Sequence, residues 1–216
     1  MTAQADLRSG TFGEYSSKRA FRLTATSSKN YRVGVVGHRY LGGIEASNYV
    51  WFCCFKLLSE FQRKHPGLVA VSASSQGADT IFADVALSLE IKLDIITPFK
   101  EFASDFQTEL GLKKMEVLHE RSSNSVCANF SKRSVSAYKK SMELVVIRSH
   151  SLIGVWDSQS NGSPGGTAQA INVAKTMGLP IFHINPRERS LSIIGPLKSY
   201  GMKEKRIELN TVGSFV

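Results

Sequence analysis

The sequence lacks a cysteine framework and a clustered set of metal ligands. Three cysteines occur among 216 residues, two of them adjacent at positions 53 and 54, and none has Cys-x-x-Cys spacing. An odd number of thiols in this arrangement argues against structural disulfides and against a zinc site, and it fits a reducing compartment. The five histidines, at positions 38, 65, 119, 150 and 183, are widely scattered. We therefore expect no bound metal, and we assign no cofactor.

The sequence also shows no hydrophobic run long enough to predict a segment that crosses a membrane. Apolar runs such as 144–147 and 152–156 contain four or five residues, whereas a membrane-spanning helix needs roughly 20. The first eight residues lack the apolar centre of a secretory signal. These features predict a cytoplasmic protein that has no membrane partner.

The 18 acidic residues are outnumbered by 27 lysines and arginines, so the formal net charge is +9. The excess is concentrated near the two ends of the chain and in one internal cluster, which we call the basic cluster. The basic cluster comprises Lys113, Lys114, Arg121, Lys132, Arg133, Lys139 and Lys140. Such a cluster is either a solvated helix surface, which can border an anionic ligand, or a surface that binds a polynucleotide.

The composition predicts one core domain between two basic extensions. With 42% hydrophobic residues in 216, the chain can form one sizeable core. Residues 1–30 are rich in Ser, Thr, Lys and Arg, and we expect an extension that is poorly ordered unless a partner subunit holds it. The core domain is predicted at residues 31–186. Residues 187–216 form a C-terminal extension, in which residues 206–210 have the pattern of an edge strand.

Strand-like and helix-like segments alternate along the core. Short apolar or β-branched runs predict strands, and apolar residues at three- and four-residue spacing predict helices. The predicted strands are residues 31–36, 68–72, 93–97, 151–156 and 179–184. The predicted helices are residues 44–64, 76–89, 101–119, 132–148 and 164–177, with a polar loop at 121–131. This alternation predicts an α/β, Rossmann-like three-layer fold with a mainly parallel sheet and helices on both faces.

Ligands of such a fold bind beyond the carboxyl ends of the strands, where three loops of unusual composition are expected. The first loop contains Gly37, His38 and Arg39 and continues to a glycine pair at 42–43. Glycine allows a ligand to approach the backbone closely, and arginine suits a two-point grip on phosphate. The alternative is a glycine turn with a surface His-Arg pair, because the loop matches neither a dinucleotide fingerprint nor a Walker A loop. His38 is either a hydrogen-bonding loop residue or a catalytic group.

The second loop contains Ser75, Gly77 and Asp79 at the start of a predicted helix. Small residues and glycine after a strand allow the amino end of the next helix to face a ligand. Asp79 lies in the first helical turn. It either favours the helix dipole there or accepts hydrogen bonds from ribose hydroxyls.

The third loop carries the strongest signal. A strand ending in Trp156-Asp157 leads through a polar loop to Gly165, Gly166 and Thr167 at the start of a helix. Glycine amides and a threonine hydroxyl at that position form an anion cradle. Asp157 would meet a ribose, a base or a catalytic water, while Trp156 is either a core residue or a stacking platform.

Taken in order, these loops resemble the SLOG superfamily, which includes the Lonely Guy phosphoribohydrolases and DNA processing protein A. The closer match is to a bacterial branch with the motifs G-H-R, G-A-D, A-Y, V-W-D and G-G-T-A. The corresponding residues are Val36-Gly37-His38-Arg39, Gln76-Gly77-Ala78-Asp79, Ala137-Tyr138, Val155-Trp156-Asp157 and Gly165-Gly166-Thr167-Ala168. The resemblance covers roughly residues 31–185.

The resemblance implies a Rossmann-like domain that binds a nucleotide or a nucleotide-derived signal, in some members within bacterial anti-phage defence. It also implies a homo-oligomer, either a dimer or a tetramer, and possible pairing with an effector protein. The implied ligand-binding residues are Gly37, His38, Arg39, Ser75, Gly77, Asp79, Tyr138, Asp157, Gly165, Gly166 and Thr167. Tyr138 is equally well explained as a buried structural tyrosine.

One departure from the family weakens the case for catalysis. Lonely Guy enzymes resemble P-G-G-x-G-T-x-x-E, in which the glutamate serves cleavage of an N-glycosidic bond. The run here is two residues shorter, and Ala170 stands three positions after Thr167. A transition state with oxocarbenium character needs a nearby carboxylate, which would then come from Asp79 or Asp157.

Three functional hypotheses follow. The first is a sensor or regulatory protein that binds a nucleotide or NAD-derived ligand carrying phosphate. The second is a nucleotide N-glycosidase that uses Asp79 or Asp157 as its catalytic carboxylate. The third is a nucleic-acid-binding protein related to DNA processing protein A that uses the basic cluster and the basic extensions.

Overall fold

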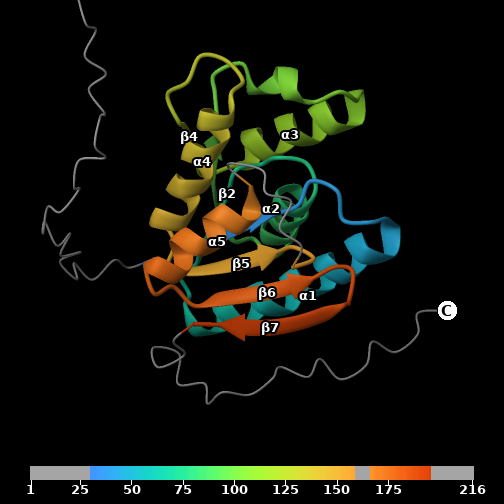
Figure 1. Ribbon diagram of the computed structural model, residues 1–216, viewed down its shortest axis with the longest axis vertical. Helices are drawn as coiled ribbons and strands as arrows, with labels where there is room; N and C mark the ends of the chain where they lie inside the picture. Colours follow the sequence, from blue (N-terminus) through green and yellow to red (C-terminus); the bar gives the residue numbers. More distant parts are fainter. Residues whose placement is uncertain (1–29, 159–165, 196–216) are drawn as a thin grey trace, which may run out of the picture.

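Seven strands form a single sheet in the order β4-β3-β2-β1-β5-β6-β7, as Figure 1 shows. The structure is a computed structural model, and it describes residues 30–158 and 166–195. The strands are β1 Arg32–Gly37, β2 Val69–Ser72, β3 Lys92–Thr97, β4 Asn124–Cys127, β5 Ser151–Val155, β6 Ile181–Asn185 and β7 Ser190–Ile194. The first six pair in parallel, and β7 pairs antiparallel with β6.

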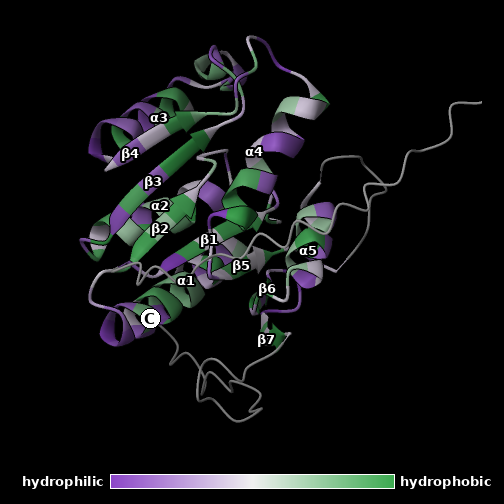
Figure 2. Cartoon of the chain, turned by 90° about the vertical axis from the view of Figure 1, so that its left-hand side faces the viewer, coloured by the Kyte–Doolittle hydropathy of each residue, from purple (hydrophilic) through white to green (hydrophobic). Residues whose placement is uncertain are grey.

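Helices cover both faces of this sheet (Figure 2). The helices are α1 Ile44–Lys64, α2 Ala78–Ser88, α3 Glu109–Arg121, α4 Val135–Ile147 and α5 Thr167–Thr176, with a 3₁₀ turn η1 at Phe102–Asp105. The helices α1, α2 and α3 contribute to a core cluster on one face, and α4 and α5 contribute to a cluster on the other. The predicted α/β, Rossmann-like three-layer fold is therefore confirmed. In the described parts of the chain, no helix combines the length and apolar character that spanning a bilayer requires.

The central strands are apolar on both sides because both sides are buried. In β1, Val33 and Val35 belong to the core beneath α1 and α2, whereas Val36 belongs to the core beneath α4 and α5. Side chains alternate between the faces of a strand, so a strand covered by helices on both faces needs a nearly continuous apolar run. The short runs in the sequence predicted these strands for this reason.

Two sequence predictions were wrong in the region 101–131. The predicted loop at 121–131 contains β4, which pairs with β3 at the sheet edge. Its residues Asn124 and Ser125 are exposed, and only Val126 and Cys127 are partly buried, so β4 lacks the apolar run by which the other parallel strands were predicted. The predicted helix at 101–119 is interrupted: η1 ends at Asp105, and α3 begins only after Thr108, whose hydroxyl caps the helix by accepting a hydrogen bond from the Gly111 amide.

The extensions are described only in part. Residues 1–29 and the predicted edge strand at 206–210 lie outside the described residues. The last strand of the sheet in the described residues is β7, and its residues belong to the segment predicted as a C-terminal extension. The β6–β7 turn carries this segment across the carboxyl end of the sheet.

The chain reverses its direction of travel across the sheet between β1 and β5. It moves outward from β1 through β2 and β3 to β4, and then returns to place β5 on the other side of β1. In open parallel sheets, ligands bind in the crevice at such a switch point, outside the carboxyl ends of the two strands. The loops that follow β1 and β5 are therefore the first place to search for a site.

We predict that Gly34→Ala destabilises the fold. A Cβ at Gly34 would lie 2.3 Å from Ser149 Oγ and 3.0 Å from Val145 Cγ1 at the end of α4. Ser149 Oγ donates a hydrogen bond to the Val145 carbonyl, so moving it away would break that bond. Overpacking of this kind costs about 1–3 kcal/mol, measurable by urea unfolding.

Val135→Ala provides the matched control on α4. Val135 is 58% exposed, so its truncation should change the free energy of unfolding by at most about 0.5 kcal/mol. Equal stability of the Gly34→Ala variant and the wild type would show that α4 can move away from β1 at no cost.

Candidate functional site

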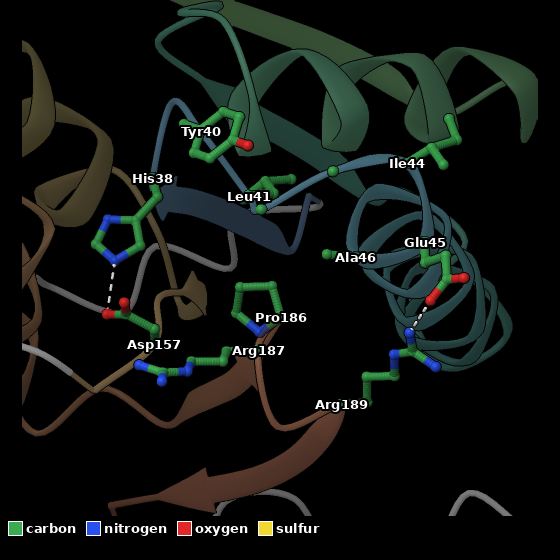
Figure 3. A pocket seen from close by; sticks show the side chains of 12 residues that line it. His38, Tyr40, Leu41, Ile44, Glu45, Ala46, Asp157, Pro186, Arg187 and Arg189 are labelled. Atoms are coloured by element: carbon green, nitrogen blue, oxygen red, sulfur yellow. Dashed lines mark hydrogen bonds and ion pairs between the residues drawn. The ribbon is translucent and has the colours of Figure 1, made fainter.

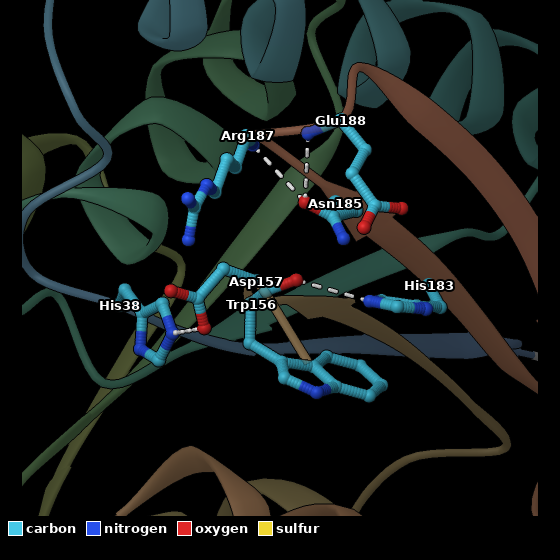
Figure 4. A network of polar contacts seen from close by, with 7 residues as sticks. All are labelled: His38, Trp156, Asp157, His183, Asn185, Arg187 and Glu188. Carbon is cyan, nitrogen blue, oxygen red and sulfur yellow. Dashed lines mark hydrogen bonds and ion pairs between the residues drawn. The ribbon is translucent and has the colours of Figure 1, made fainter. Parts of the chain in front are cut away.

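A histidine and an aspartate meet across the switch point. His38 follows β1, Asp157 follows β5 by two residues, and His38 Nε2 lies 3.1 Å from Asp157 Oδ1 (Figure 4). The backbone fixes the pair, because the His38 amide donates to the Val155 carbonyl over 2.9 Å. Both side chains are partly exposed, at 25% and 30%. The pair is therefore ordered by the sheet yet accessible to a ligand.

This pair forms one end of a groove with a volume of about 520 Å³. Three segments line the groove: His38 with residues 40–46, Asp157, and the β6–β7 turn through Pro186, Arg187 and Arg189 (Figure 3). All three segments follow the carboxyl ends of neighbouring strands, β1, β5 and β6. The groove therefore occupies the position in which Rossmann-like folds bind ligands.

A glycine pair leads into α1 along one wall of the groove. Gly42 and Gly43 have φ angles of 96° and 126°, a backbone region in which residues with a Cβ are strained. No atom lies within 4 Å of the position that a Cβ would take at either glycine, so the backbone there is open to a ligand. Gly43 is the N-cap of α1 and provides no side-chain cap, which leaves the first-turn amides without a side-chain acceptor.

The opposite wall is the β6–β7 turn, which Asn185 holds in shape. The Asn185 side chain is buried, and its Oδ1 accepts hydrogen bonds from the Arg187 and Glu188 amides, both over 3.0 Å (Figure 4). Arg189 forms an ion pair with Glu45 across the groove. Arg187 forms no ion pair with any residue in 30–158 or 166–195, and Figure 3 shows its side chain extended along the groove toward Asp157.

Arg39 does not line the groove, although it follows His38 directly. Its guanidinium lies 2.8 Å from Asp105 Oδ2 and 4.9 Å from the centre of the Tyr138 ring. Asp105 is only 4% exposed and also pairs with Arg133, whose Nε lies 3.2 Å from Oδ1. Arg39 is thus held by a buried carboxylate and an aromatic face, which occupy part of the donor capacity that a phosphate would use.

Gly77 brings the second loop into backbone contact with the first. Its φ is 87°, and a Cβ there would lie 2.3 Å from the Arg39 carbonyl oxygen and 2.5 Å from that of His38. The Ala78 amide donates to the His38 carbonyl over 3.1 Å. The glycine is required for this close contact, and the amide at the start of α2 is already used within the protein.

Asp79 is a buried carboxylate beside these two loops. It is 7% exposed, and its Oδ2 accepts a hydrogen bond from the Ser75 amide over 3.3 Å. Burial raises the pKa of Asp79 to about 7, while the Ser75 hydrogen bonds and the charge of Arg39 act in the opposite direction. The charge of Arg39 thus acts on Asp79, but both residues lie outside the lining of the groove.

The third loop is described only at its two ends. Trp156 packs against the core beneath α5 and stacks on His183 with ring centres 3.6 Å apart, so it takes the role of a partly buried core residue. Gly166 is the N-cap of α5, and Thr167 is 8% exposed. Gly165 lies outside the described residues.

Comparison with known proteins finds similarity in structure but not in sequence. No family model and no curated protein matches the chain. DNA processing protein A from Streptococcus pneumoniae is 16% identical, with a TM-score of 0.53 over 72% of this chain and 50% of that one. The Helicobacter pylori protein of the same name is 19% identical, with a TM-score of 0.50 over 71% of this chain and 64% of that one.

The chain shares the fold of part of DNA processing protein A. This likeness shows a shared Rossmann-like fold, as the predicted fold class requires. The chain spans between half and two thirds of the length of these two DNA processing proteins. Among the described residues, no group of three or more His, Cys, Asp or Glu side chains is arranged to hold a metal ion.

Within this DNA processing protein A fold, the predicted site residues fall into two groups. His38 and Asp157 line the groove. The other predicted site residues in the described part of the chain are outside its lining: Gly37, Arg39, Ser75, Gly77, Asp79, Tyr138, Gly166 and Thr167. Sequence reasoning placed the glycine pair 42–43 in the first loop without assigning it to the ligand site, and it omitted Tyr40 and the two arginines of the β6–β7 turn, all of which line the groove. The glycine pair before an apolar helix was a usable signal, and the turn was missed because it lies beyond the predicted domain boundary.

We predict that Asp79→Asn stabilises the protein at alkaline pH. A raised pKa means that the folded state holds the Asp79 proton more tightly than the unfolded chain does, so this contribution to stability is present at acidic pH and is lost as the pH rises through about 7. Asparagine cannot ionise, and its oxygen can still accept from Ser75. One pKa unit corresponds to about 1.4 kcal/mol, so we expect a gain of at least about 1 kcal/mol at pH 8.5 that shrinks toward pH 5.

Asp84→Asn is the control, because Asp84 is a partly exposed residue of the same helix that pairs with Lys114. Denaturant unfolding of both variants across this pH range measures the effect. A gain for Asp79→Asn that stays constant with pH would mean that the carboxylate is not forced toward its neutral form by burial.

Proposed function

We propose that the chain binds a nucleotide or NAD-derived ligand carrying phosphate in the groove at the switch point, as a sensor or regulatory protein. The observation that carries this proposal is the position of the groove, which joins the carboxyl ends of β1, β5 and β6. Its volume of about 520 Å³ lies within the range of small-molecule sites, about 300–1,000 Å³. The proposal also includes the expected homo-oligomer, whose assembly or contact with an effector the ligand would change.

The groove offers two features that suit phosphate. The first is the amino end of α1, a helix of 21 residues whose first-turn amides have no side-chain cap. Helix amino ends attract anions through these amides and through the helix dipole. The second is Arg187, whose guanidinium has no carboxylate partner among the described residues and can form a two-point contact with phosphate.

Binding is better supported than N-glycosidic cleavage. Cleavage needs a carboxylate beside the sugar, and the groove provides two, Asp157 and Glu45. Asp157 lies within hydrogen-bonding distance of His38, and Glu45 pairs with Arg189. Asp79, the other predicted catalytic carboxylate, is buried outside the groove lining, and its raised pKa keeps it partly protonated near neutral pH. All three carboxylates thus have roles within the protein.

We predict that Arg187→Gln weakens binding of phosphate-bearing ligands. ADP-ribose, cyclic ADP-ribose, NAD and AMP would be screened by thermal shift, because a ligand that binds only the folded state raises the melting temperature. A hydrogen bond to a charged group contributes about 1.5–3 kcal/mol, so loss of the guanidinium should raise the dissociation constant by about tenfold or more.

Arg148→Gln is the charge-matched control. Arg148 follows α4 and precedes β5, so it lies at the amino ends of the strands, whereas the groove lies at their carboxyl ends. If no phosphate-bearing ligand stabilises the wild type, the proposed function is wrong. If ligands bind and the two variants behave alike, the phosphate does not contact Arg187.

Binding of single-stranded DNA is the second candidate, favoured by the unpaired part of the basic cluster. The Helicobacter pylori protein that shares the fold is described by its single-stranded DNA binding mode. Three residues of the basic cluster pair with carboxylates: Lys114 with Asp84, Arg133 with Asp105 and Lys139 with Glu143. The other four form no ion pair with the described residues: Lys113, Arg121, Lys132 and Lys140.

If this surface binds DNA, affinity should fall steeply with salt, because each neutralised phosphate releases counterions. Fluorescence anisotropy with a labelled single-stranded oligonucleotide at two salt concentrations measures this slope. A Lys113→Glu, Arg121→Glu double variant should then flatten the slope, while Arg148→Glu should leave it unchanged. Absence of binding at low salt would exclude this candidate.

A further inference from the structure

The two ends of the groove differ in chemistry. Beside the polar end formed by the His38–Asp157 pair and Arg187, the groove is lined by large apolar side chains that solvent reaches. Tyr40 is 81% exposed and Ile44 is 74% exposed, both in the segment that links β1 to α1 (Figure 3). These are among the most exposed large hydrophobic side chains in the described residues. An apolar wall beside a polar end is the usual composition of a site for an amphipathic small molecule.

The Tyr40 ring is exposed to solvent, while the next residue along the chain is buried in the core. Leu41 is only 7% exposed and belongs to the core beneath α1, so the backbone at position 41 is fixed. The Tyr40 ring makes no stacking contact with another described aromatic ring, unlike Trp156, which stacks on His183. An exposed ring on a fixed backbone can stack with a planar ligand at little cost in conformational entropy.

Two polar side chains of the groove, those of Asp157 and Arg187, lie where the ribose and phosphate of a nucleotide would be if its base stacked on Tyr40. In Figure 3, Tyr40 and Arg187 are on opposite sides of the groove, and Asp157 lies between the Arg187 guanidinium and His38. A carboxylate at the end of a strand in a Rossmann-like site can accept hydrogen bonds from ribose hydroxyls. Arg187 is fixed at its backbone by Asn185, and it is the groove-lining arginine that has no ion pair with the described residues.

We propose that the groove selects ligands with a nucleobase, holding the base against Tyr40 and the phosphate at Arg187. This inference rests on the proposed function and adds a specificity determinant to it. A sugar phosphate alone would meet only the polar end, and a nucleoside alone would meet only the apolar wall and Asp157. Tyr40 and Arg187 therefore make separable contributions to the affinity for a nucleotide.

The test is a matrix of three probes and three variants measured by isothermal titration calorimetry. The probes are AMP, adenosine and ribose 5-phosphate, and the variants are Tyr40→Ala, Tyr40→Phe and Arg187→Gln. Removing a stacking aromatic weakens binding of a base by about tenfold. Tyr40→Ala should therefore weaken AMP and adenosine by about that factor and leave ribose 5-phosphate unchanged. Arg187→Gln should weaken AMP and ribose 5-phosphate and leave adenosine unchanged.

Tyr40→Phe keeps the ring and should bind all three probes as the wild type does. Because Tyr40 is 81% exposed, its truncation is not expected to affect folding, and circular dichroism of each variant checks this. If Tyr40→Ala weakens AMP and ribose 5-phosphate equally, or weakens neither AMP nor adenosine, the stacking role is refuted while ligand binding by the groove stands. If the wild type binds no probe that carries phosphate, the proposed function fails together with this inference.

Discussion

The arrangement of the site depends on one close backbone contact, at Gly77. The start of α2 lies so close to the His38 and Arg39 carbonyls that a Cβ at Gly77 would come within 2.5 Å of both oxygens. The Ala78 amide fixes this contact with a hydrogen bond to His38. The first loop is thus held at the carboxyl edge of the sheet, where His38 reaches Asp157 and the next residue, Arg39, reaches Asp105.

Because His38 contacts Asp157 whereas Arg39 contacts Asp105, only one of these two first-loop side chains lies at the groove. Arg39 has the residue type that phosphate binding requires, but a carboxylate that is only 4% exposed already holds it. An arginine left without a buried carboxylate, such as Arg187, can form a full two-point contact with an incoming anion. The difference between the two arginines is the carboxylate partner of Arg39, Asp105, which is far from it in the sequence and which a local motif therefore does not reveal.

The sequence predicted the elements that follow from local patterns. Five of the seven strands, β1, β2, β3, β5 and β6, were predicted, because they have the apolar character that burial requires, whereas β4 and β7 were not. What local patterns could not predict was β4, which pairs through its backbone, and Arg187, whose approach to the groove depends on how the chain turns after β6.

The antiparallel strand β7 explains why the groove has a second wall. If the sheet ended at β6, no β6–β7 turn would form, and the groove would lack the wall that this turn provides opposite α1. Pairing of β7 with β6 forces a tight turn there, and the buried Asn185 oxygen stabilises that turn by accepting two amide hydrogens. The ion pair from Arg189 to Glu45 then joins the turn to the first turn of α1. The strand that completes the sheet is therefore also the element that brings Arg187 to the groove opposite Tyr40.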